Sequence, residues 1–217
     1  MPEPRFSTML AAGTAAEHEG AQSAPFVQAL LSGRLNLTGY AALVAQHYFI
    51  YRELERTAQL MSADAVAREF VFGELVRLPS LEADLEHLLG QAWRAEITPV
   101  PATSEYCLRI AEVGARSSTG FVAHHYTRYM GDLSGGRAVR AAVRRHHDLP
   151  EDAGTRFYEF DAIEKPKLFK DVYRERLDAA PWDDVERQRV IDESVRAYRH
   201  NHRVFADLST DIERFVA

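Results

Sequence analysis

The chain has 217 residues, of which 46% are hydrophobic, and its formal net charge is −6. This length and composition are typical of one globular domain that buries a sizeable core, and the acidic balance excludes the basic footprint of a general nucleic-acid-binding protein. A lone cysteine, Cys107, excludes an internal disulfide and a cysteine-cluster metal site.

Membrane proteins and exported proteins are two further classes that the sequence can test. No apolar run approaches the roughly 20 residues of a membrane span, and the first ten residues lack the apolar centre of a signal peptide. We therefore expect a cytoplasmic protein that has neither a membrane nor a nucleic acid as a partner. We also expect it to act as a monomer. Residues 1–6 are expected to be disordered.

Apolar residues recur at helical spacing along the chain, and no alternating strand pattern, internal repeat or low-complexity linker interrupts them. The pattern predicts a helix that ends at Gly33 and a long helix that Thr38 caps and that runs to residue 61. Further helices are predicted over residues 63–78, 80–93, 104–117 and 119–147.

The last third of the chain contains two more predicted helices. Turn residues at 149–154 end the preceding helix, and residues 157–163 are predicted as a short extended link. A helix over 165–178 follows, and Pro181 opens a last helix to residue 215 whose acidic first turns suit the helix dipole. The sequence therefore predicts an all-α single domain over residues 1–217, with about eight helices.

The stretch YMGDLSGGRAV places Gly131, Gly135 and Gly136 inside a predicted helix, where each glycine costs about 1 kcal/mol relative to alanine. Gly131 and Gly135 share a helix face with Arg128 and Asp132. Glycines allow a backbone to approach something flat or bulky, and close helix packing is the alternative explanation. A buried carboxylate is costly unless paired, so we expect a polar group or water to meet Asp132.

Lysines are confined to one short stretch. The chain has 26 basic residues, of which only Lys165, Lys167 and Lys170 are lysines, all within EKPKLFK. This cluster is either a solvated helix start or an anion-binding patch on an acidic protein.

At these residues a family resemblance emerges. HHYTRYMGDLSGG resembles the distal-helix signature of the haem oxygenases, AAEHEGAQSAPF resembles their proximal segment, and NHRVFADL resembles a later segment of the family. The resemblance covers nearly the whole chain and is strongest to the bacterial enzymes that extract iron from haem. It implies an all-α fold that holds haem between a proximal helix and a kinked distal helix.

The resemblance also implies an activity. Haem b and O2 would be converted to biliverdin, carbon monoxide and ferrous iron. The electrons would come from an external ferredoxin or NAD(P)H-dependent reductase.

On the proximal side, the resemblance implies that His18 is the haem iron ligand, since haem iron commonly takes one imidazole. The family's usual glutamate partner, one turn later, is Gln22 in this chain. A neutral amide lends less anionic character to the imidazole than a carboxylate, so we expect a slightly weaker iron–histidine bond.

On the distal side, the resemblance implies that the glycine backbone at 131, 135 and 136 lies over the porphyrin and leaves room for O2. Asp132 would hold water beside the bound oxygen, so that the oxygen is protonated and delivered to a ring carbon. Arg128 would keep Asp132 ionised. Tyr51 and Asn201 match further members of the distal water network.

The resemblance also implies a ligand for the basic cluster, because the two haem propionates are anionic. The resemblance assigns Lys170, Arg174 and Tyr126 to this grip, and it implies haem contacts for Ser134 and Phe205. Charge-assisted bonds at an exposed edge are individually modest, so their main effect is to orient the haem.

One position departs from the family pattern. Much of the family has a propionate-binding lysine seven residues before the proximal histidine, and this chain has Ala11 there. Arg5 is the candidate substitute. Cleavage at the alpha-meso carbon is the expected regiochemistry.

Two other functions share this architecture. A haem storage or carrier protein needs no proton-delivery network, so Asp132, Arg128 and Tyr51 favour the enzyme. A thiaminase-like hydrolase would need a catalytic cysteine, for which Cys107 is thin support.

The remaining histidines are expected in surface or supporting roles, because adjacent helical residues point apart. These are His124, His125, His146, His147, His200 and His202. Asp84 and His87 resemble half of a di-iron carboxylate motif, but a second Glu-x-x-His copy is missing.

Overall fold

A computed structural model of the chain describes residues 4–216. Ten α-helices account for most of this range, and it contains no strand. The predicted all-α fold is thereby confirmed. The four long helices are α1 (Phe6–Gln22), α3 (Leu37–Met61), α7 (Ser118–His146) and α9 (Asp184–Thr210). The shorter helices are α2 (Pro25–Leu31), α4 (Leu78–Leu89), α5 (Trp93–Glu96), α6 (Pro101–Arg109), α8 (Pro166–Ala179) and α10 (Ile212–Phe215).

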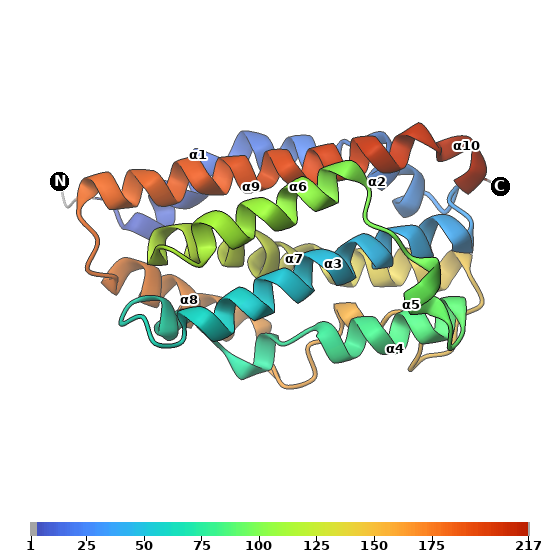
Figure 1. The fold of residues 1–217 in the computed structure, drawn as a ribbon, viewed down its shortest axis with the longest axis horizontal. Helices are drawn as coiled ribbons and strands as arrows, with labels where there is room; N and C mark the ends of the chain where they lie inside the picture. Colours follow the sequence, from blue (N-terminus) through green and yellow to red (C-terminus); the bar gives the residue numbers. More distant parts are fainter. Residues whose placement is uncertain (1–3, 217) are drawn as a thin grey trace.

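The long helices run roughly along the longest axis of the molecule (Figure 1). Helices α1 and α9 lie side by side along one edge, α4 lies along the opposite edge, and α3, α6 and α7 lie between them. Helix α7 packs against α9, α2 and α3. In its glycine-rich stretch, Leu133 and Gly136 are buried whereas Gly135 is exposed.

Short polar side chains set where the helices begin. Asn36 Oδ1 accepts a hydrogen bond from Gly39 N at 2.9 Å, so α3 starts at Leu37 and the predicted Thr38 cap is wrong. The last helix starts at Asp184 rather than at Pro181, because Asp183 and Glu186 form a reciprocal capping box.

The helix predicted over residues 63–78 is wrong. Asp64 Oδ1 accepts hydrogen bonds from the Val66 and Ala67 amides at 2.9 and 2.8 Å, which favours a turn over helix propagation. Two 3-10 helices, Ala67–Phe70 and Gly73–Leu75, follow instead. Their apolar residues still enter the core, which explains why the sequence pattern looked helical.

The extended link predicted at 157–163 is also wrong at its start, where the chain forms the 3-10 helix Arg156–Tyr158. The fully buried Asp84 carboxylate accepts from the amides of Arg156 and Phe157 at 2.9 and 2.8 Å. Asp84 therefore anchors this segment, and no cluster of three metal-ligating side chains occurs among residues 4–216.

The rest of the predicted helices need smaller changes. The helix expected over 104–117 begins earlier, at Pro101, and continues into the π-helix Ile110–Gly114. Helix α7 is continuous from Ser118 to His146, and a kink at its glycines stays a prediction. Residues 1–3 lie outside the described part of the chain. Phe6 begins α1 and is 3% exposed, so the expected disorder does not extend to it.

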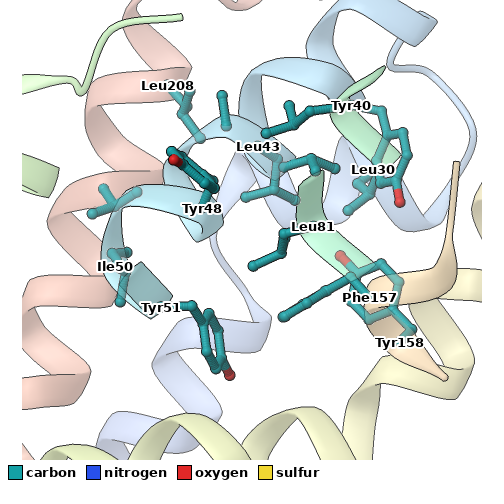
Figure 2. Packing of buried hydrophobic residues seen from close by; sticks show 14 of the residues in the cluster. Leu30, Tyr40, Leu43, Tyr48, Ile50, Tyr51, Leu81, Phe157, Tyr158 and Leu208 are labelled. Carbon is teal, nitrogen blue, oxygen red and sulfur yellow. The ribbon is translucent and has the colours of Figure 1, made fainter. Parts of the chain in front are cut away.

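Aromatic side chains of α3 and of the segment 156–158 share one core (Figure 2). The rings of Tyr51 and Phe157 meet edge to face with their centroids 5.1 Å apart. This packing, together with Asp84, fixes Tyr158 against α7 close to the glycine-rich stretch.

Candidate active site

Two adjoining cavities lie between the long helices. The larger has a volume of about 180 Å³ and the smaller one of about 120 Å³, and His18, Gly131 and Tyr198 line both. Of the residues predicted from the sequence, the larger cavity is lined by His18, Arg128, Gly131, Asp132, Gly135, Gly136, Asn201 and Phe205. The smaller cavity is lined by Tyr126, Ser134, Lys170 and Arg174 in addition to His18 and Gly131.

His18 projects from α1 with its ring accessible. Its ring meets that of Tyr198 on α9 edge to face, with the centroids 5.9 Å apart, and it forms no hydrogen bond to the side chains that the structure describes. Helix α1 is held close to α9 at Gly20, where an added Cβ would lie 2.9 Å from His202 Cε1. A free imidazole is the group that haem iron commonly takes as a ligand.

The three glycines of α7 divide into two kinds. A Cβ added at Gly131 or Gly135 would meet no atom within 4 Å, whereas one added at Gly136 would lie 2.9 Å from Tyr158 Cδ1. Close packing therefore explains Gly136, although its main chain still lines the cavity. Packing does not explain Gly131 and Gly135, which leave a bare stretch of backbone on the cavity wall.

A buried polar cluster surrounds Asp132. Arg128 donates from Nη1 to Asn201 Oδ1 at 2.8 Å and from Nη2 to His47 Nδ1 at 3.0 Å. The same Nη2 lies 3.8 Å from Asp132 Oδ2. The Tyr51 hydroxyl donates to Asp132 Oδ2. The structure thus brings together all four residues predicted for the distal network.

Burial dominates the electrostatics of this cluster. It raises the pKa of Asp132 above its usual value, and Arg128 and the Tyr51 hydrogen bond offset only part of that shift. The direction is opposite to the one expected from Arg128 alone. Burial and the neighbouring Asp132 raise the pKa of Tyr51 well above its usual value, so its hydroxyl stays protonated.

The smaller cavity gathers the cationic residues. Lys170 Nζ donates to Ser134 Oγ at 3.2 Å, and Arg174 Nη1 bonds Asp171 Oδ1 at 2.7 Å. Burial raises the pKa of the Tyr126 hydroxyl, which therefore remains a donor. The wall therefore includes two cations and, with Tyr198, three hydroxyl-bearing residues, which suits a pair of carboxylates.

The expectations on Arg5 and Gln22 have different outcomes. Arg5 is the N-cap residue of the helix, 13 positions before His18, which is about 20 Å along the axis. It lines neither cavity, so it is no substitute for the lysine missing at Ala11. The Gln22 side chain lies outside the part that the structure describes, and its effect on the iron–histidine bond stays a prediction.

Sequence reasoning missed two residues of the site, His47 and Tyr198. Both line the larger cavity. His47 precedes Tyr51 by one helical turn and Tyr198 precedes Asn201 by three residues, so helical spacing from residues already singled out could have found them.

The adjacent histidines of α7 lie in the core rather than at the surface. His124 Nε2 donates to Glu193 Oε1 at 3.1 Å, and His125 Nδ1 lies 2.9 Å from the Tyr173 hydroxyl. The two side chains are 0% and 2% exposed. Both are structural residues of the helix packing.

Cys107 does not support the hydrolase alternative. Its thiol donates to the Phe49 carbonyl at 3.4 Å, and burial raises its pKa to about 12. It lines neither of the two cavities described above. A thiol held protonated is a poor nucleophile.

Comparisons with known proteins agree with the fold and the site. The family model described as heme oxygenase matches residues 4–207. A heme oxygenase of Porphyra purpurea is 36% identical over 94% of this chain and 86% of its own length. Heme oxygenase 1 of a Nostoc strain is 34% identical over 95% of this chain and 87% of its own length.

A solved structure extends the match to three dimensions. The crystal structure of heme oxygenase-1 from Synechocystis in complex with heme superposes with a TM-score of 0.92 at 33% identity, over 97% of this chain and 95% of that one. The chain belongs to the heme oxygenase family.

Among the described residues, no helix is long and apolar enough to cross a membrane.

Proposed function

We infer that this chain is a haem oxygenase that binds haem between α1 and α7 and opens its ring to biliverdin, carbon monoxide and ferrous iron. One observation carries this inference. The open space over Gly131 and Gly135 faces the larger cavity, which the free imidazole of His18 also lines, with Asp132 between the two glycines. A flat ligand with a metal at its centre suits such a space.

The residues present fit haem. His18 would ligate the iron, and the bare backbone of α7 would lie over the opposite face of the macrocycle. Gly131 and Gly135 leave that space open at a cost of about 1 kcal/mol each in helix propensity, which a binding role explains and packing does not. When bound, haem supplies the oxygen-activating iron and the carbon that is oxidised.

The protein's own contribution to the chemistry is a carboxyl group, Asp132, that orders water and exchanges protons with it. Tyr51 donates to one oxygen of Asp132, and Arg128 keeps a positive charge nearby without a close contact. The carboxyl group therefore has an acceptor oxygen left to order water. Its raised pKa brings proton exchange with that water nearer to neutral pH, which suits a relay that delivers protons to the reacting centre.

Orientation of the ring is assigned to the smaller cavity. Lys170, Arg174 and Tyr126 would bind the propionates, with Ser134 holding the Lys170 ammonium in place. With Ala11 at the family's lysine position, the grip rests on α7 and α8 rather than on α1. Cleavage at the alpha-meso carbon is the regiochemistry we propose.

The electron donor, the oligomeric state and the compartment complete the proposal. The reaction consumes electrons, which we assign to an external ferredoxin or NAD(P)H-dependent reductase. The protein would act as a monomer in the cytoplasm.

A haem carrier on the same fold is the main alternative. A carrier needs the iron ligand and the propionate grip, but it has no use for a buried carboxyl held by Tyr51 and flanked by Arg128. The buried cluster at Asp132 therefore favours the enzyme.

A spectroscopic assay tests the proposal. The purified chain is mixed with hemin, then with ascorbate or a ferredoxin system in air. We expect the sharp Soret band to give way to a broad red-absorbing product, with release of carbon monoxide and chelatable iron. A persistent Soret band with intact haem would support the carrier instead.

A further inference from the structure

His47 is a buried residue that lines the larger cavity. Its imidazole has no role in the proposed reaction. It lies on α3 one turn before Tyr51, is 6% exposed, and stacks on Phe157 with the ring centroids 5.0 Å apart. Its Nδ1 is 3.0 Å from Arg128 Nη2. The ring is thus fixed by packing on one side and by a hydrogen bond on the other.

The partner settles the state of this imidazole. A guanidinium group only donates hydrogen bonds, so Nδ1 of His47 must be the acceptor and Nε2 must carry the hydrogen. A second hydrogen on Nδ1 would place two cations in contact. Burial and Arg128 both lower the pKa of His47, which keeps the ring neutral.

The same Arg128 nitrogen stands between two acceptors. Nη2 bonds His47 Nδ1 at 3.0 Å but stays 3.8 Å from Asp132 Oδ2, beyond hydrogen-bond distance. The other terminal nitrogen, Nη1, is committed to Asn201. His47 and Asn201 therefore hold the guanidinium so that it faces Asp132 without closing on it.

We propose that His47 is a positioning residue of the distal network, whose Nδ1 holds Arg128 back from Asp132 and so leaves the carboxyl group available to order water. The inference rests on the proposed function of this site, but the hydrogen-bond arrangement can be tested without turnover.

Removing the acceptor has a definite physical consequence. A buried charged N–H without a partner is costly, and Asp132 Oδ2 lies 3.8 Å from Nη2 and can accept a second hydrogen bond beside the one from Tyr51. The guanidinium would close on the carboxylate and form a tight ion pair. An opposite charge brought into contact lowers a carboxyl pKa, so the Asp132 titration should move down by about 1 unit.

Two variants separate this role from mere packing. His47→Leu keeps the apolar volume and removes the acceptor, whereas His47→Asn places an amide oxygen close to where Nδ1 was. The groups whose charges also act on Asp132 are the same in both variants, namely Arg128, Arg77, Tyr51, Tyr129, Tyr158 and Tyr198.

The experiment follows the Asp132 carboxyl carbon by NMR in the full haem-free chain labelled with [13C]aspartate, with Asp132→Asn to assign the signal. We expect the midpoint to fall by about 1 unit in His47→Leu and to stay near the wild-type value in His47→Asn. Circular dichroism and one-to-one hemin binding check that each variant is folded, and His47→Met replaces His47→Leu if the latter does not fold.

Other results would overturn the proposal. An unchanged midpoint in His47→Leu, a rise, or equal shifts in the leucine and asparagine variants would each show that His47 only fills space. A failure of the hemin assay on the wild-type chain would instead count against the proposed function, so the two failures are distinguishable.

Discussion

At the scale of single residues, Asp132 is the group on which the proposed chemistry depends. It is held by Tyr51 and faced by Arg128 on the wall of the cavity that His18 also lines. Sequence reasoning could name these residues because their spacing matches a known motif. It did not predict that burial raises the Asp132 pKa, because the extent of burial is a property of the packed bundle and not of the motif.

Replacing Asp132 should separate binding from turnover. In Asp132→Asn we expect hemin to bind as in the wild-type chain, because the residue does not ligate iron. Ring opening should slow by roughly 100-fold or more, since proton delivery by a positioned group contributes at least that factor. Single-turnover absorbance in air measures the rate and a hemin titration measures binding. Ring opening at the wild-type rate would contradict the role of this carboxyl.

The glycines of α7 yield a second prediction because only some of them pack. Gly135→Leu should abolish or greatly weaken hemin binding, since the side chain would enter the open cavity, while Gly135→Ala should raise the melting temperature of the haem-free chain. Gly136→Ala should lower the melting temperature instead, because its Cβ would collide with Tyr158. Normal hemin binding by Gly135→Leu would refute the assignment of the cavity.

At the scale of elements, the helices that carry the site were largely predictable and their ends were not. Helical periodicity indicated α3, α7, α8 and α9. The cap at Asn36 and the turn at Asp64 were not predicted. A short polar side chain near a helix end can bond any of several backbone amides, and the sequence does not show which amide it will bond. The anchoring of segment 156–158 by Asp84 depends on a long-range contact that no local pattern encodes.

A largely buried ion cluster joins α6, α7 and α9, and it predicts that stability depends on pH. Arg109 of α6 bonds both Glu193 oxygens at 2.8 and 2.6 Å, and His124 of α7 adds a third bond. Burial alone would raise the pKa of Glu193, but these bonds outweigh it and hold the pKa at about 2.

Because the folded-state pKa of Glu193 is depressed, its contribution to stability is fully present above the unfolded-state value and is lost as the pH falls toward 2. Glu193→Gln should therefore lower the free energy of unfolding by about 3 kcal/mol at pH 7. The difference from wild type should shrink between about pH 4.5 and 2. Urea unfolding at several pH values measures this, and a difference that does not change with pH would exclude the ion cluster as its cause.

At the scale of the whole molecule, the bundle places the proposed iron ligand His18, the polar cluster at Asp132 and the cationic wall around two adjoining cavities. Pairing of α1 with α9 positions His18. The hydrogen bond from Lys170 of α8 to Ser134 of α7 helps to position the proposed propionate grip. The sequence predicted these groups from their resemblance to a family. It could not show that Arg5 is too distant to serve, because that requires knowing where α1 begins.

The cationic wall should determine which carbon is attacked. Lys170→Ala combined with Arg174→Ala should leave ring opening active but produce a mixture of biliverdin isomers, because the ring can then rotate about the iron–histidine bond. Chromatography of the products measures the isomers, and Lys167→Ala is a matched control on the same helix that lines neither cavity. A single unchanged isomer from the double variant would show that other contacts orient the ring.

The most direct test is a crystal structure of this chain with haem bound. We predict that the iron is coordinated by His18 and that the backbone at Gly131 and Gly135 lies over the opposite face, with Asp132 close to it but not coordinated. Haem bound at another surface, or an iron that His18 does not coordinate, would contradict the account.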